Sequence, residues 1–349
     1  MNVERLPRPG KLGARPRTGR NLGNIREKRM RRLLMGMAVA MTALMGTALM
    51  GTAHAADKKV TIGVSIPAAD HGWTAGVVYH ANRVAKLLMA EHPGLNVIVK
   101  TSPDAASQAN ALEDLTTQGI NALVILPSNP DPLVNAIKQV KSKNIFVTLV
   151  DRAPSNNDNS VRDLYVAGNN PALGAVAGEY IKKHTPDAQV VVIRGLPIPI
   201  DQQRQDGFDN AIKGSNVKVL EKQFGNWNRD DAFKVMQDYL TKYPKIDVVW
   251  CQDDDMAVGV LQAIQQAKRT DIQYVIAGAG SKDMVKKVMD GDKLIPVDVL
   301  YPPAMIGTAM ELTAANFYDQ VPVRGTYIMD ATLITKENAK EFYFPDSPF

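Results

Sequence analysis

Polar and aromatic residues follow several short apolar runs of the sequence, at the places where those runs end. They are Asp70, His71, Trp73, Asp151, Arg152, Gln202, Arg204, Trp227, Asn228, Asp253 and Tyr301. Aromatic rings can cover the apolar faces of a polyhydroxylated ligand, and the polar side chains can pair with its hydroxyl groups. Asp151 and Asp253 supply two negative charges. Arg152 and Arg204 supply two positive charges, so the set is balanced without a ligand and favours a neutral one.

Several of these residues also have a purely structural interpretation. Trp73 and Trp227 could be core aromatics, but each is predicted to lie in a polar loop, which favours contact with a ligand. The consecutive aspartates Asp253, Asp254 and Asp255 could cap the helix predicted directly after them, because carboxylates stabilise helix N-termini. We assign that capping role to Asp254 and Asp255 and keep only Asp253 in the site.

Residues 56–349 lack the patterns typical of catalysis or metal binding. Their histidines are His71, His80, His92 and His184, and the spacing is not that of a zinc site. The single cysteine, Cys251, lies in an apolar run, and the sequence has no G-x-S-x-G motif. The segment 278–281 lacks the third glycine of a dinucleotide-binding loop. We therefore expect no metal, no cofactor and no enzymatic activity.

Apolar, β-rich runs alternate with helical patterns from Val60 onward, which is typical of βαβ units and parallel sheets. Strands are predicted at 60–66, 97–101, 122–126, 146–150, 164–167, 190–194, 217–224, 248–251, 274–278 and 296–300, and helices after residues 104, 171, 201, 230, 256, 281 and 303. In open parallel sheets, ligands bind beyond the carboxyl ends of the strands. Asp151 and Arg152 could instead form a salt-bridged loop, but their position at a strand end favours the site. Arg204 could be a helix-surface charge, and its position alone does not decide between that role and the site.

The first 55 residues have the pattern of an export signal. Arginines at positions 29, 31 and 32 precede an uncharged run, 33–53, and the small-x-small triplet 53–55 suits signal peptidase. We predict cleavage between Ala55 and Ala56. A transmembrane anchor is the alternative, but Gly and Thr residues dilute the apolar run. The long basic stretch before it suggests that translation starts at Met30 instead of Met1.

Removal of this leader changes the net charge and the length that the fold must account for. The whole chain of 349 residues has a net charge of +5, and residues 1–55 contribute eleven basic and two acidic side chains, so the remainder carries −4. A nucleic-acid partner is therefore not expected. The remaining 294 residues exceed what one core usually organises, which indicates two lobes. No cysteine lies near the cleavage site, so we expect a protein without a lipid anchor.

The order of these elements and three segments of the sequence carry a family resemblance. The segments are VDR at 150–152, PIPIDQQRQDGF at 197–208 and WCQDDDMAVG at 250–259. They resemble the periplasmic sugar-binding proteins of ABC importers, of the ribose-binding type. The resemblance implies an α/β fold of two Rossmann-like lobes with parallel sheets, joined by a three-segment hinge near Ala167, Tyr301 and Asp330. The lobes would comprise 56–167 with 302–330, and 168–301 with 331–349.

The resemblance also assigns ligand contacts. It implies that an aromatic, here Trp73, packs on the sugar ring, and that the residues matching the other family positions contact it as well. Those firm matches are Asp151, Arg152, Arg204 and Trp227. Three family positions carry a different residue here: Asp253 stands for an asparagine, Ala279 for an aspartate and Tyr301 for a glutamine. Which sugar or polyol binds is therefore left open.

The function that the resemblance implies is capture of a neutral sugar or polyol between two closing lobes, followed by delivery to a membrane permease. The protein would act as a monomer in the periplasm. The alternative is a sensor that presents its ligand to a chemoreceptor or sensor kinase, since both roles need the same closure. A transcription factor of the LacI type shares the fold, but it would need a helix-turn-helix where this chain has its apolar leader.

Overall fold

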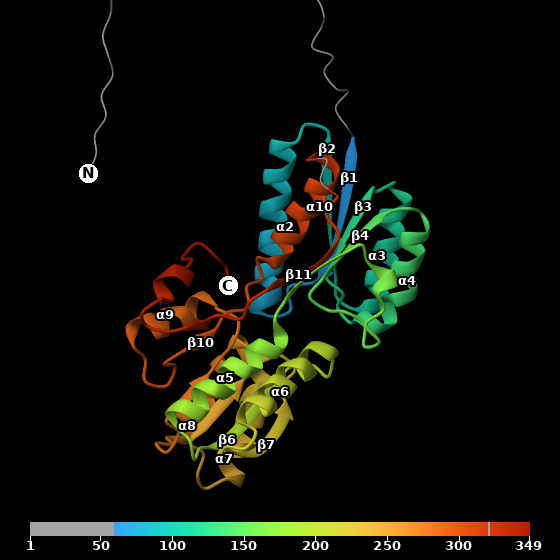
Figure 1. Cartoon of the computed structure of the whole chain (residues 1–349). Helices are drawn as coiled ribbons and strands as arrows, with labels where there is room; N and C mark the ends of the chain where they lie inside the picture. Colours follow the sequence, from blue (N-terminus) through green and yellow to red (C-terminus); the bar gives the residue numbers. More distant parts are fainter. Residues whose placement is uncertain (1–58, 320–321) are drawn as a thin grey trace, which may run out of the picture. The chain divides into compact units, whose positions relative to one another are not determined.

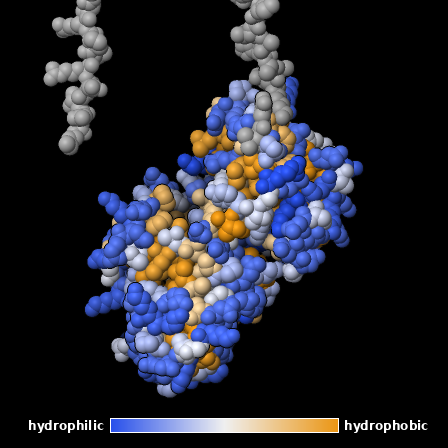
Figure 2. All heavy atoms as spheres, viewed as in Figure 1, coloured by the Kyte–Doolittle hydropathy of each residue, from blue (hydrophilic) through white to orange (hydrophobic). Residues whose placement is uncertain are grey.

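The computed structural model describes residues 59–319 and 322–349. The predicted leader and its cleavage site lie outside the described residues. Helices and strands alternate through both ranges (Figure 1). On the face seen in Figure 2 the surface is largely hydrophilic, with apolar atoms gathered around strand β10 (Asp298–Val299).

Among the described residues, the first sheet has six strands in the order β11-β5-β4-β3-β1-β2, and every neighbouring pair is parallel. Its strands are β1 (Val60–Pro67), β2 (Leu95–Ser102), β3 (Ala122–Ile125), β4 (Phe146–Val150), β5 (Leu164–Gly168) and β11 (Gly325–Met329). Helices α2 (Gly72–Glu91) and α10 (Met305–Tyr318) pack on one face. Helices α3 (Ala105–Thr117) and α4 (Pro130–Ser142) pack on the other (Figure 1).

Strand β3 shows why its sequence is apolar throughout. Ala122 and Val124 belong to the core cluster that includes α2 and α10, whereas Leu123 and Ile125 belong to the cluster of α3 and α4. Successive side chains of a strand point to opposite faces of the sheet. Because helices cover both faces, every residue of β3 is buried.

The second sheet, with four strands in the described ranges, has the order β7-β6-β8-β9 and is parallel throughout. Its strands are β6 (Gln189–Arg194), β7 (Lys218–Phe224), β8 (Val248–Cys251) and β9 (Tyr274–Ile276). Its helices are α5 (Asn170–His184), α6 (Pro199–Ile212), α7 (Arg229–Lys242), α8 (Asp254–Ala267) and α9 (Lys282–Asp290). Trp250 stacks on Phe208 of α6 on one face, and Cys251 packs with Met236 and Met256 on the other.

The chain passes between the two main sheets three times. It leaves the first sheet after β5, returns between β10 and α10, and leaves again after β11 to reach β12 (Leu333–Ile334). Strand β12 pairs antiparallel with β10, and β11 pairs parallel with β5. Two parallel α/β sheets joined by three passages confirm the predicted fold class. The exact lobe boundaries stay a prediction.

The structure differs from the predicted elements at several points. The predicted strand 296–300 is reduced to Asp298–Val299, which pairs antiparallel with β12, while Leu300 forms an isolated parallel bridge with Ala279. Pro296 has no N–H group with which to extend the strand at its start. Helix α8 begins at Asp254, ahead of the predicted start. Helix α2 begins directly after His71, so Trp73 lies in the first turn of a helix instead of a loop.

Candidate ligand-binding site

A cavity lies where segments from both sheets meet. It is lined by His71, Trp73, Asp151, Arg152, Ile200, Arg204, Trp227, Asp253, Gly278, Ala279 and Tyr301. Asp151 follows β4 of the first sheet, and Asp253 follows β8 of the second. Most of the predicted site residues are therefore brought together.

Asp151 is held in an unusual backbone conformation at the end of β4. Its φ of +60° lies in the left-handed region, which non-glycine residues adopt only when the surroundings enforce it. The Asp151 N–H donates to the Val166 carbonyl at 2.8 Å, and the Tyr165 hydroxyl donates to the Asp151 carbonyl at 2.6 Å. The Tyr301 hydroxyl donates to Asp151 Oδ1. These bonds fix the carboxylate of Asp151 at the wall of the cavity.

Arg152 is buried and only partly paired. Its Nη1 donates to the Ser128 carbonyl at 2.8 Å and to the Pro127 carbonyl at 3.2 Å. Its Nε forms an ion pair with Asp151 Oδ2 at 3.6 Å, too far for a hydrogen bond, and has no hydrogen-bond partner among the described residues. Burial lowers the pKa of Arg152, and the nearby Asp151 carboxylate opposes that shift. The side chain therefore keeps a free donor beside the cavity.

Arg204 reaches the site from helix α6. Its Nε donates to Asn170 Oδ1 at 2.8 Å, and its Nη1 donates to the Gln252 carbonyl at 2.7 Å. The guanidinium carbon lies 4.4 Å from the centre of the Tyr301 ring and 5.9 Å from the centre of the Trp227 ring. A guanidinium is attracted to aromatic faces, so Arg204 also orients both rings.

Trp227 forms one aromatic wall of the cavity. Its φ of +53° is again in the left-handed region. Gly195 makes room for the indole, because a Cβ at that position would lie 1.9 Å from Trp227 Nε1. The ring stacks on His71, with ring centres 6.5 Å apart, and Arg152 lies 5.3 Å from its centre. Trp227 Nε1 is buried and has no partner among the described residues.

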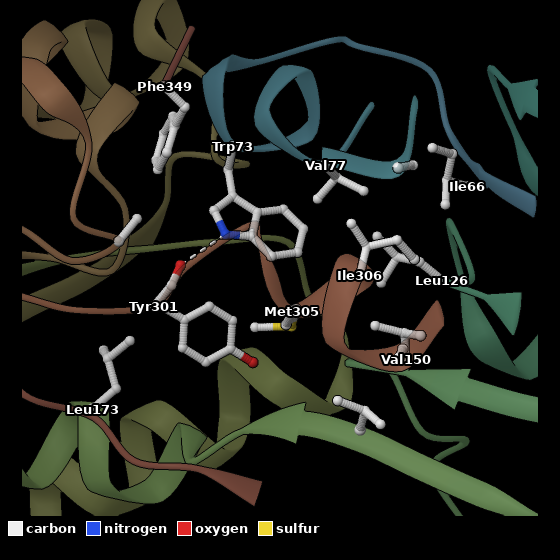
Figure 3. Close-up of a cluster of buried hydrophobic side chains, with 14 of the residues drawn as sticks. Ile66, Trp73, Val77, Leu126, Val150, Leu173, Tyr301, Met305, Ile306 and Phe349 are labelled. Atoms are coloured by element: carbon white, nitrogen blue, oxygen red, sulfur yellow. Dashed lines mark hydrogen bonds between the residues drawn. The ribbon is translucent and has the colours of Figure 1, made fainter. Parts of the chain in front are cut away.

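Trp73 is a core residue and a cavity residue at once. Its Nε1 donates to the Tyr301 carbonyl at 2.9 Å. Figure 3 shows its indole between Phe349 and Val77, with the Tyr301 ring below it. Trp73 therefore lines the cavity, but it lies in a helix instead of the predicted loop, and most of its ring packs in the core.

Asp253 caps helix α8 and lines the cavity. Its Oδ1 accepts from the Asp255 N–H at 2.8 Å and the Met256 N–H at 3.3 Å. Burial raises the pKa of Asp253 to about 7, with a further contribution from Asp254 and Asp255, while His71 opposes the shift. A carboxyl group with this pKa can change its charge near neutral pH.

Asp254 and Asp255 lie in the first turn of α8, where carboxylates stabilise the helix start, but the N-cap itself is Asp253. Asp254 also accepts from the Gly278 N–H at 2.9 Å and the Ser281 N–H at 2.6 Å. Asp255 accepts from the Gly72 N–H at the start of α2. Asp254 therefore fixes the Gly278 segment, and Asp255 connects helices that belong to the two main sheets.

Three predicted site residues do not line the cavity. Asp70 is mostly exposed; it accepts from His71 Nδ1 at 2.6 Å, and although burial raises its pKa, bonds from His71 and Thr74 lower it to about 2. Gln202 accepts from Arg194 Nη2 at 2.8 Å. Asn228 caps helix α7 by accepting from the N–H groups of the next helical turn. Each of these side chains is engaged elsewhere.

Two lining residues and one supporting residue were not predicted. Ile200 lies two residues before Gln202 in the 197–208 segment, and Gly278 ends a predicted strand. Neither was predicted, because neither carries a polar or aromatic side chain. Asn170 bridges Arg204 and Tyr301, with Nδ2 donating to Tyr301 Oη at 2.9 Å. No sequence signal distinguishes Asn170 from the adjacent Asn169, which has the same side chain but caps helix α5.

The site contains aromatic walls, two arginines and two aspartates. In residues 59–319 and 322–349, no three or more His, Cys, Asp or Glu side chains are grouped to hold a metal ion. Across the same ranges, no helix has the length and apolar character needed to cross a membrane. Fold and site together define a protein that encloses a small polar ligand between two parallel α/β sheets.

Comparison with known proteins names the family. The chain belongs to the family described as the periplasmic binding protein domain, whose model matches residues 62–316. This is a family of solute-binding proteins and not an enzyme family. The ribose import binding protein of Escherichia coli (strain K12) is 31% identical over 71% of this chain and 83% of its own length.

Solved structures show the same relationship. A galactofuranose-binding protein superimposes with a TM-score of 0.74 and 25% identity, covering 83% of this chain and 100% of its own. A solute-binding protein of an ABC transporter from Mycobacterium smegmatis, with bound glycerol, has a TM-score of 0.73 and 27% identity. It covers 83% of this chain and 98% of its own.

Proposed function

We propose that this chain is the substrate-binding component of an ABC importer, which captures a neutral sugar or polyol and delivers it to a membrane permease. The relatives named above are similar in sequence and fold, and their names or bound ligands include ribose, galactofuranose and glycerol. The cavity has the matching chemistry, because rings can cover C–H faces while charged side chains pair with hydroxyl groups.

The observation that carries the proposal is a pair of buried donors without partners. Arg152 and Trp227 both line the cavity, and their buried Nε and Nε1 atoms have no hydrogen bond among the described residues. A buried donor left unpaired costs about 1–3 kcal/mol. Ligand hydroxyl oxygens at these two positions would remove that cost. Asp151 and Asp253 supply acceptors for the hydroxyl protons, so the site suits a ligand that both accepts and donates.

Binding would be coupled to closure of two lobes. Gly72 donates to Asp255, and His71 stacks on Trp227, so each contact joins a segment of the first sheet to one of the second. A ligand held from both sides favours the closed state, because only that state makes all its contacts. We propose that 56–167 with 302–330 and 168–301 with 331–349 move as the two rigid lobes.

The test is calorimetric titration with tetritols, pentitols, pentoses and hexoses, repeated on a matched pair of variants. Trp227→Phe removes an unpartnered donor of a cavity-lining residue, whereas Trp250→Phe removes an equally unpartnered N–H of a buried residue in β8 that does not line the cavity. We expect about fivefold weaker binding for Trp227→Phe, the value of a neutral hydrogen bond, and no change for Trp250→Phe. Equal affinities for both variants, or no binding of any sugar or polyol, would refute the proposal.

Residues 1–55 are proposed to direct export, so the mature protein would begin at Ala56 and act as a monomer in the periplasm. Mass spectrometry of protein from a periplasmic extract would give its first residue, and sedimentation would give its oligomeric state. We further propose that the ligand leaves unchanged, since no paired nucleophile and base border the cavity among the described residues. Recovery of a chemically altered ligand after incubation would overturn this last point.

A further inference from the structure

Residues 344–349 form a strap that runs from the elements of the second sheet to helix α2 of the first. The strap follows the 3₁₀ helix η2 (Ala339–Phe342), whose Ala339 is buried in the core of the second sheet. It lies beyond residues 62–316, the part of the chain that matches the family model. Family membership therefore assigns no role to the strap.

The strap is attached to the second sheet through Lys282 at the start of α9. Lys282 Nζ donates to the Ser347 carbonyl at 2.8 Å and to the Pro345 carbonyl at 3.4 Å. Within the strap, the Ser347 N–H donates to the Phe344 carbonyl at 3.1 Å, and the Phe349 N–H donates to Ser347 Oγ at 3.2 Å. Its two prolines have a fixed φ, so the strap has little conformational freedom to lose when it docks.

The other end of the strap places the Phe349 ring on helix α2. A Cβ at Gly76 would lie 3.0 Å from Phe349 Cβ, and a Cβ at Gly72 would lie 3.1 Å from Phe349 Cδ2. The two glycines are four residues apart, so they lie on the same face of the helix. Glycine is unfavourable in a helix relative to alanine, but here it leaves the space that the ring fills. Phe349 is only 8% exposed.

The docked ring lies next to two features of the ligand site. Figure 3 shows it beside the indole of Trp73, which lines the cavity. Asp255 accepts from the Gly72 N–H, and its Oδ2 would lie 2.6 Å from a Cβ at Gly72, so the carboxylate and the ring contact the same glycine. Phe349 therefore packs at the point where α2 meets both the cavity and helix α8.

We propose that the strap stabilises the closed state: Phe349 docks on α2 when the two lobes close, holds Trp73 in the cavity wall and slows release of the ligand. This proposal rests on the proposed function, since the strap acts on the same closure. Lys282 holds one end on the second lobe and α2 receives the other end on the first. Opening then requires the ring to leave its recess, and exposure of a buried aromatic ring to water is unfavourable.

The test compares four single variants by calorimetric titration with ribose, xylitol, glucose and sorbitol. Phe349→Ala removes the ring, and Phe344→Ala, at a side chain of the same strap that is 63% exposed, is its control. Lys282→Gln removes the charged attachment, and Lys286→Gln, at an exposed residue of the same helix, is its control. We expect about tenfold weaker binding for Phe349→Ala, about fivefold weaker binding for Lys282→Gln and no change for either control.

Stopped-flow fluorescence and a double variant separate a closure role from simple core packing. We expect the ligand to dissociate about tenfold faster from Phe349→Ala, with an association rate within about twofold of the unaltered protein. Phe349→Leu keeps apolar bulk in the recess and should restore most of the affinity. The double variant Phe349→Ala, Lys282→Gln should bind no more weakly than Phe349→Ala alone, because both changes release the same strap.

The outcomes distinguish this proposal from the proposed function. Equal affinities of Phe349→Ala and the unaltered protein, or losses that add in the double variant, overturn the role of the strap and leave the proposed function intact. The absence of binding for every sugar and polyol overturns both. If Phe349→Ala does not fold, as judged by circular dichroism, Lys282→Gln at the partly exposed end decides, and an unchanged affinity in that variant overturns the role of the strap.

Discussion

Replacing Asp253 by asparagine should stabilise the ligand-free protein at neutral pH. Asp253 is buried, and burial raises the pKa of its carboxyl group from 3.8 to about 7. The unfolded chain loses this proton near its ordinary pKa, whereas the folded protein keeps it until the pH is much higher. Asparagine resembles the protonated form and is as good an N-cap as aspartate, so the start of helix α8 should persist.

The magnitude follows from the difference between the two pKa values. One pKa unit corresponds to about 1.4 kcal/mol, so a rise of about three units destabilises the ionised protein by about 4 kcal/mol. The folded state binds more protons between the two pKa values, so the free energy of unfolding falls as the pH rises through that window. The cost is absent below about pH 4 and fully developed above about pH 7.

Urea unfolding at intervals from pH 4 to pH 8 measures this effect. The free energy of unfolding of Asp253→Asn should equal that of the unaltered protein near pH 4 and exceed it by about 4 kcal/mol at pH 8. Asp230→Asn, at an exposed aspartate in the first turn of α7, is the matched control and should show no such divergence. A parallel pH course for Asp253→Asn and the unaltered protein would refute the burial argument.

Two further predictions concern the closure of the two lobes and the packing of Tyr301 against Gly168. Asp255→Asn weakens the acceptor for the Gly72 N–H, so ligand affinity measured by calorimetry should fall about fivefold; the exposed Asp283→Asn is its control, and equal losses in both would contradict a closure role. Gly168→Ala forces a clash with Tyr301 and should cost about 1–3 kcal/mol of unfolding free energy. That cost should shrink in a Tyr301→Leu background, and an undiminished cost would place the clash elsewhere.

The parallel sheets could be predicted because their strands carry the signal of burial on both faces. In β3 and β8 every residue is buried, and the runs read as continuous apolar segments. Strand β11 gives no such signal, since it lies at the edge of its sheet and most of its side chains are exposed. Its pairing with β5 depends on the path of the chain after α10. The residues of β11 themselves carry no pattern that indicates this path.

A position beyond a strand end indicates which residues reach the cavity but not which of their atoms are available to a ligand. Asp151, Arg152 and Asp253 line the cavity, and each follows a buried parallel strand. Asn228 also follows a strand, yet its side chain caps α7. A residue at a strand end can serve the next helix or the cavity, and that choice depends on where the helix begins, within one or two residues.

The role of Tyr301 lies furthest from what the sequence can indicate. Its partners are Asp151 and Asn170, more than one hundred residues away in the chain, and the space for its ring exists because position 168 is a glycine. A tyrosine in place of the glutamine that the family resemblance implies signals only that the ligand differs. The fold converts that single difference into a ring that packs against Gly168 and a phenol that engages the carboxylate of Asp151.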